Sequence, residues 1–174
     1  LSAGQHRAAW KPHDGPIHYK RPGWSGADAT SHASLYLQSA TRGETKPALV
    51  MHPPWTPIGS VFCDYLVRLP SITPLRLSFA TAIRDSTPQE PVSDGVLFRV
   101  WASPNSSTDE PRLLFERFTD TKRWAPGEAD LSAYAGQTIL LRFESHPGPA
   151  DNTFCDASYW GDPVIYGGPP APRG

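Results

Sequence analysis

The stretch VFCDYLVRL, residues 61–69, carries the pattern that decides the fold. Its apolar side chains fall on alternate positions: Val61, Cys63, Tyr65, Val67 and Leu69. Asp64 and Arg68 fall between them. A period of two indicates a β-strand with one buried face, because successive side chains of a strand point to opposite faces. The stretch therefore predicts a strand that covers a core.

The same period recurs along most of the chain. The longer examples are LRLSFATAI (75–83), GVLFRVWA (95–102) and TILLRFE (138–144), and the shorter ones are 34–38, 48–52, 112–118 and 163–166. In the first of them the expected inward set is Leu75, Leu77, Phe79, Thr81 and Ile83. About eight short strands with one polar face each predict an all-β fold, a two-sheet antiparallel β-sandwich of the jelly-roll type.

The composition excludes several other classes of protein. The 174 residues include 20 prolines and 14 glycines, which argues against a helical bundle because proline breaks helix interiors. The formal net charge of -1 gives no global attraction to nucleic acid or to anionic lipid. No apolar run approaches the roughly 20 residues that a membrane-spanning helix needs. We therefore expect neither a nucleic acid nor a membrane as partner.

Three segments are expected along the chain. Residues 1–30 lack a sustained period and are interpreted as a leader that packs on the domain. Residues 31–166 would form the sandwich, and 167–174 (GGPPAPRG) a proline-rich linker to another domain. The chain starts at Leu1 without a methionine or a signal peptide, which indicates a piece of a longer protein.

No motif in the sequence indicates catalysis. There is no G-x-S-x-G elbow, no H-E-x-x-H and no glycine-rich phosphate loop. His13 and His18 could hold a metal ion, although a polar loop is the preferred interpretation. Glu116 and Glu128 are candidates for a glycosidase carboxylate pair only by default, because such pairs are defined by their separation in space. We therefore expect no catalytic residues.

Two tryptophans lie in loop-like strings beside polar side chains. Trp55 follows His52 in MHPPWTP, and Trp124 lies in DTKRWAPGE. Indole faces stack on the C–H faces of sugar rings, while the hydroxyls bind planar polar groups. The predicted ligand-binding residues are Trp55, Trp124, His52 and Arg84. The alternatives are that the indoles fill the core and that His52 satisfies a buried carbonyl.

The sequence also suggests a calcium site and a disulfide, each with an alternative. Asp156 and Asp162, near the end of the chain, are candidate ligands for calcium, because carboxylates with loop carbonyls suit a hard cation. Ordinary Asx turns are the alternative. Cys63 and Cys155 could form a disulfide that closes a loop of about 90 residues, worth around 4 kcal/mol. They could equally be buried thiols.

The strings SDGVLFRVWA (93–102), ADLSAYAGQTILLRFES (129–145) and FCDASYWGDPVIY (154–166) together resemble one family. It is the NPCBM-like group of carbohydrate-binding modules, which are galactose-binding-domain-like jelly rolls. ALVMHPPW (48–55) is similar to the family's G-x-H string, but Val50-Met51 replaces its glycine. The insertion DSTPQEPVS (85–93) has no counterpart in the family's pattern.

This resemblance implies a non-catalytic module, often with one structural calcium ion, attached to a secreted enzyme that acts on glycosides. Asp156 matches the family's terminal aspartate. The leading interpretation is a sugar-binding module that targets an attached glycoside hydrolase to a polysaccharide or glycan. The alternatives are a structural or protein-interaction sandwich and, third, a catalytic jelly roll such as a polysaccharide lyase or a small glycosidase.

Overall fold

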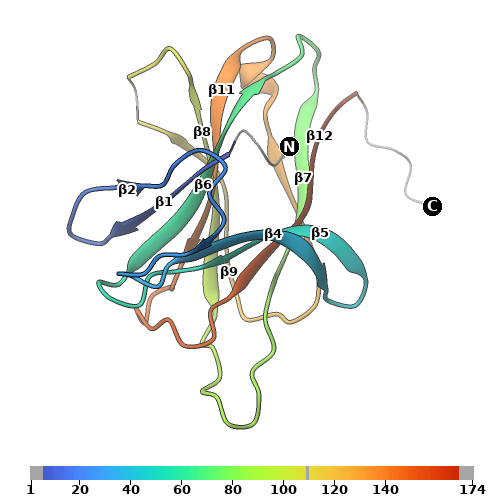
Figure 1. The fold of residues 1–174 in the computed structure, drawn as a ribbon. Helices are drawn as coiled ribbons and strands as arrows, with labels where there is room; N and C mark the ends of the chain where they lie inside the picture. Colours follow the sequence, from blue (N-terminus) through green and yellow to red (C-terminus); the bar gives the residue numbers. More distant parts are fainter. Residues whose placement is uncertain (1–5, 109, 169–174) are drawn as a thin grey trace.

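The computed structural model describes residues 6–108 and 110–168 as two packed β-sheets (Figure 1). Their strands are β1 (His6–Pro12), β2 (His18–Tyr19), β3 (Gly26–Ala27), β4 (Ser34–Thr41), β5 (Thr45–His52), β6 (Gly59–Arg68), β7 (Leu75–Ile83), β8 (Val96–Pro104), β9 (Arg112–Thr119), β10 (Ala125–Asp130), β11 (Thr138–His146) and β12 (Ser158–Gly167). The helical structure within these ranges is one 3-10 turn, Ser132–Tyr134. None of the described residues forms a helix with the length and apolar character that a membrane span requires.

Each sheet has six antiparallel strands. The first sheet has the order β2-β1-β6-β11-β8-β9, and the second has the order β10-β7-β12-β5-β4-β3. The central neighbours β6 and β11, or β7 and β12, are distant in the sequence, as in a jelly roll, whereas β8 and β9 or β4 and β5 are consecutive. The two sheets lie face to face (Figure 1). The all-β sandwich predicted from the period of two is confirmed.

The core lies between the sheets and is centred on Trp160 of β12. Its side chain is fully buried and contacts Phe79, Phe98 and Phe143, with ring centroids 5.3, 5.1 and 5.1 Å away. These rings come from strands of both sheets, so one indole ties the sandwich together. Loss of such a side chain typically costs about 3–5 kcal/mol of unfolding free energy. The inward set expected for residues 75–83 is buried throughout.

Four strands, β1, β2, β3 and β10, were not predicted from the sequence. The sequences of β10 and β1 show why the period of two did not reveal them. β10 contains Pro126 and Gly127, which weaken a strand pattern, but it lies at the edge of the second sheet, where proline is tolerated. In β1, Ala8, Ala9 and Trp10 are all buried, so its sequence does not alternate. β1 pairs with β6 along its whole length and is therefore part of the first sheet.

Two further expectations concern the cysteines and the C-terminal end. Cys63 is buried in β6, Cys155 is half-buried in the loop before β12, and both are free thiols. The alternative of two unpaired cysteines therefore holds. The proposed linker 167–174 falls almost entirely outside the described residues, because β12 ends at Gly167 and the description ends at 168.

Candidate functional site

The outward face of the second sheet has a floor of small side chains. The strand register aligns two rows across β4, β5, β12 and β7, namely Tyr36–Val50–Tyr159–Ala82 and Gln38–Ala48–Gly161–Ala80. Because alanine, glycine and valine are short, the surface is hollow between the larger side chains around it. A hollow of about 430 Å³ lies over the first row and is bounded by His32 and Trp55. We call this face, from Trp55 to Trp124, the groove.

Trp55 stands at one end of the groove as an exposed platform. Its side chain is 54% exposed, which is the largest exposure among the tryptophans of the chain. Its ring stacks on His32 with centroids 4.7 Å apart and planes 27° apart. The backbone N–H of Trp55 donates to the carbonyl of Ser31 (2.8 Å), so the loop after β5 is fixed against the turn before β4.

His52 leaves the indole N–H of Trp55 available. Nδ1 of His52 lies 2.7 Å from the carbonyl oxygen of Pro53, a contact that requires a proton on Nδ1. The indole nitrogen of Trp55 is 3.3 Å from the same Nδ1, which then has no lone pair to offer it. Burial lowers the pKa of His52, and nearby Arg84 lowers it further, so the ring is neutral at pH 7. This contact with the Pro53 carbonyl fits the alternative given for His52, that it satisfies a buried carbonyl.

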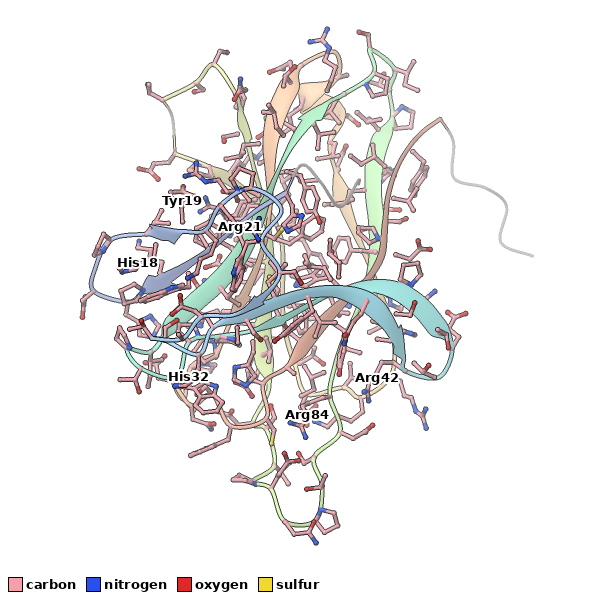
Figure 2. All side chains as sticks on the ribbon, in the orientation of Figure 1. His18, Tyr19, Arg21, His32, Arg42 and Arg84 are labelled. Atoms are coloured by element: carbon pink, nitrogen blue, oxygen red, sulfur yellow. The ribbon has the colours of Figure 1, made fainter. Side chains whose placement is uncertain are left out.

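Arg84 belongs to a second hollow beside Trp55. This hollow has a volume of about 560 Å³, and its lining includes His52, Trp55, Arg84, Glu90 and Phe154. The guanidinium donates to both carboxylate oxygens of Glu90, at 2.8 and 2.6 Å. The pair presents a planar cation and a planar anion at the wall of a hollow that also contains the apolar side chains of Ile58 and Phe154. In Figure 2, Arg84 lies on the same side of β4 and β5 as His32 and Arg42.

Trp124 lies at the other end of the groove and is half-buried. Its indole N–H donates to the carbonyl of Glu44 (2.8 Å), and its ring meets Tyr159 edge-on at 6.3 Å. The ring covers Gly161 so closely that a Cβ on this residue would lie 2.9 Å from it. A larger residue at position 161 would displace the Trp124 ring. Arg42 stacks on the face of Tyr159 at 4.7 Å.

The structure thus brings three of the four predicted ligand-binding residues together. His52, Trp55 and Arg84 line one hollow, while Trp124 lies farther along the same face. Four further residues complete the groove and were not predicted from the sequence: His32, Tyr36, Arg42 and Tyr159. A signal for Tyr36 was present, because it lies on the polar face of the predicted strand 34–38. The others depend on which strands are neighbours.

Asp156 is a buried carboxylate with one oxygen unused. It is fully buried; Oδ1 accepts from the Ser93 hydroxyl (2.6 Å), and Oδ2 has no hydrogen-bond partner among the described residues. Burial, together with nearby Asp94, raises the pKa of Asp156 to about 7, although the hydrogen bond from Ser93 and the charge of Lys122 lower it. Nζ of Lys122 is likewise buried without a hydrogen-bond partner in this part of the chain. The unused oxygen fits a bound cation, since buried charges need a counter-charge.

Asp162 has different surroundings from Asp156. It lies at the bulge of β12 with a φ of 46°, and it lines the hollow next to Trp124. Its side chain is exposed. The structure therefore does not place the two predicted metal ligands in one set.

The other candidates from the sequence are paired separately. Glu116 of β9 accepts a hydrogen bond from Arg99 (2.7 Å) on the first sheet. Glu128 of β10 accepts one from Arg76 (2.7 Å), and both of these residues lie on the second sheet. His18 stacks on Trp10 with centroids 4.0 Å apart, so it does not form a clamp with His13. His13 instead contacts Asp151 (2.8 Å).

Comparison with known proteins supports the fold more strongly than a family. No protein-family profile matches the sequence. An uncharacterized protein of Archaeoglobus fulgidus is 29% identical over 137 residues, which cover 74% of this chain and 33% of that protein. The chain thus spans about a third of the length of the curated relative that it matches.

Solved structures with the same architecture are more informative. The C-terminal family 22 carbohydrate-binding module of Clostridium thermocellum Xyn10B has a TM-score of 0.52 at 13% identity, with 94% of this chain and 86% of that one covered. A family 61 module, solved with β-1,4-galactotriose, has a TM-score of 0.50 at 16% identity, with coverage of 82% and 86%. The chain shares the jelly-roll fold of these modules. At such identities the likeness concerns the fold alone.

Proposed function

We propose that the groove binds a carbohydrate chain and that the protein is a non-catalytic carbohydrate-binding module. The observation that carries the proposal is Trp55, an exposed indole held flat by His32 at the border of two hollows. The C–H face of a pyranose ring packs on such a platform. The polar groups that surround it suit the sugar hydroxyls.

Three polar groups near Trp55 are suited to hydroxyls. The indole N–H is a donor, the carboxylate of Glu90 is an acceptor, and the guanidinium of Arg84 is a planar donor. Because Arg84 and Glu90 hold each other, they lose little freedom when a ligand arrives. Each sugar hydroxyl exchanges a hydrogen bond with water for one with the protein, and the net gain in binding free energy is small. We therefore expect dissociation constants from about micromolar to millimolar.

The shape of the groove suits internal sugar units of a polysaccharide chain. Its floor crosses four strands, and hollows lie at both the Trp55 end and the Trp124 end. A chain of sugars that lies across the sheet can contact both ends. Structural neighbours were solved with β-1,4-galactotriose or are described as a xylan-binding domain, so β-1,4-galactan and xylan are the first ligands to test.

The wider role of the protein is also a proposal. The sequence strings that resemble NPCBM-like modules support an accessory domain of a secreted glycoside hydrolase that holds its enzyme on glycan. The match to one third of a longer archaeal protein is in keeping with a domain of a larger chain. The structural or interaction sandwich remains the competing function, and it requires no ligand for the groove.

A calcium ion at Asp156 is the second part of the proposal. A carboxylate oxygen that is buried and unpaired suits a hard cation, and Asp94 adds a second negative charge nearby. Such an ion would neutralise the carboxylates and stabilise the loop before β12. Lys122 is the competitor, because its ammonium group can supply the counter-charge instead.

Affinity electrophoresis tests the sugar site. In gels that contain xylan or β-1,4-galactan, the protein should be retarded by at least one of the two, and Trp55→Ala should abolish the retardation. Trp101→Ala is the matched control, because Trp101 is a half-buried indole on the outward face of the first sheet. Migration that no polysaccharide changes would favour the structural sandwich. New chain ends released from either polymer would instead indicate the catalytic alternative.

A further inference from the structure

Two histidines and an aspartate meet at a point that the proposed sugar contacts do not use. His13 follows β1, His146 ends β11, and Asp151 belongs to the loop between β11 and β12. One ligand atom from each of the three side chains lies within 4.8 Å of the others. They come from three separate segments, so their meeting results from the tertiary fold and not from local sequence.

The contacts among the three side chains are close. Nε2 of His13 lies 2.8 Å from Oδ1 of Asp151, and the two imidazole rings have centroids 5.0 Å apart with planes tilted by 39°. The backbone N–H of Gly148 donates to Nδ1 of His146 (3.0 Å), so this ring nitrogen carries a lone pair and no proton. A metal ion would take such a lone pair in exchange for one weak hydrogen bond.

The ligand types select the class of metal. Two imidazoles and one carboxylate suit zinc and other borderline divalent ions, whereas calcium prefers oxygen ligands alone. Zinc bonds of about 2.0–2.2 Å place tetrahedral ligand atoms about 3.3–3.5 Å apart. The observed spread of up to 4.8 Å, with one pair at 2.8 Å, reaches this arrangement by small side-chain rotations. Without an ion, His13 pairs with Asp151 while His146 accepts from Gly148 and contacts the His13 ring, so an ion would be the partner that joins all three side chains.

We propose that His13, His146 and Asp151 form a zinc-binding site, with water at the fourth position. The site would tie the loop after β1 and the loop before β12 to the end of β11. Asp151 also lines the hollow beside Trp55, and the backbone N–H of His13 donates to the carbonyl of Ile58 (3.1 Å), which lines it too. Zinc at this point therefore fixes one wall of the proposed sugar site.

Calorimetric titration of the metal-stripped full chain with zinc chloride, without sugar, tests the proposal. We expect one zinc ion per chain and a higher melting temperature with zinc. His13→Ala and Asp151→Asn should each weaken binding by roughly a hundredfold, the upper end of the loss seen when even a supporting residue of a metal site is removed. Both side chains are exposed, so these variants should fold.

His18→Ala is the matched control, since His18 lies on the same N-terminal segment but stacks on Trp10. It should bind zinc as the unaltered chain does, and so should Asp156→Asn. No saturable zinc binding would overturn the proposal, and so would equal binding by the His13 variant. Because no sugar is present, neither result depends on the proposed glycan function.

Discussion

His32 and Trp55 stack with their ring centroids 4.7 Å apart, although 23 positions separate them in the chain. His32 reaches this position because its backbone is left-handed, with a φ of 61°. The stack holds the exposed indole in one orientation before any ligand arrives. An oriented platform loses less conformational entropy on binding, which raises affinity without an added contact.

His32→Ala should therefore weaken glycan binding while Trp55 remains in place. An aromatic pair contributes about 0.5–1.5 kcal/mol beyond its buried area, so we expect a loss of about two- to tenfold in affinity. Calorimetry with the polysaccharide that retards the protein measures it. His18→Ala is the control, because its ring stacks on Trp10 and not on Trp55, and it should leave the affinity unchanged. An unchanged affinity of the His32 variant would contradict the role given to the stack.

The two loop tryptophans should differ in their effect on stability. Trp55→Ala should lower the unfolding free energy by no more than about 1.5 kcal/mol, because its ring is mostly exposed and the stack on His32 is the main packing that it loses. Trp124→Ala should cost about 2–4 kcal/mol, because its ring packs over Gly161 and against Tyr159. Urea unfolding of both variants measures the difference. Similar losses in both would contradict the distinction between a platform and a packed indole.

Much of the fold could be predicted from local pattern, and the reason is physical. In strands such as 75–83 the side chains of one face are apolar because they point into the core, so the sequence shows the period of two. β10 could not be found in this way, because Pro126 and Gly127 are acceptable only at an edge, and edges follow from strand order. Strand order depends on contacts between distant segments, which a local period does not encode.

The same limit applies to the site. His52 and Trp55 could be predicted as neighbours because they are three positions apart, and Arg84 joined them as a loop residue at a strand end. The stack of His32 on Trp55 required the left-handed turn and the pairing of β4 with β5. Asp156 and Asp162 are close in the sequence, but a bulge in β12 and the burial of only one of them separate their environments.

Asp28 should make the Trp55 end of the groove sensitive to acid. Burial of this carboxylate opposes ionisation, but hydrogen bonds from Lys20, Ser31 and Thr30 outweigh burial and hold the pKa of Asp28 far below its ordinary range. Ser31 in turn accepts from the backbone N–H of Trp55. A carboxyl whose pKa is lowered by folding contributes stability above its unfolded pKa of about 3.9 and loses it as the pH falls further.

Asp28→Asn should therefore lower the unfolding free energy at pH 7 by about 1–3 kcal/mol, as expected when a buried hydrogen-bonded charge loses its partners. Below about pH 4 the deficit should shrink, because the unfolded state of the unaltered protein then takes up a proton on Asp28 while the folded state does not, and this lowers its unfolding free energy. Urea unfolding between pH 7 and pH 2 measures both effects. Asp14→Asn, at an exposed carboxyl, is the control. A deficit that is constant down to pH 2 would contradict this account.

Calcium should raise the melting temperature through Asp156. An ion that binds only the folded state stabilises it by about 2.7 kcal/mol at a concentration 100 times its dissociation constant, which is several degrees for a chain of this size. Differential scanning calorimetry in chelator and in millimolar calcium measures the shift. Asp156→Asn should remove the shift and Asp162→Asn should retain it, because only Asp156 has a buried oxygen without a partner among the described residues. If Asp162→Asn removed the shift and Asp156→Asn retained it, the ion would bind at the bulge of β12 instead. Identical melting in chelator and in calcium would mean that Lys122 alone supplies the counter-charge.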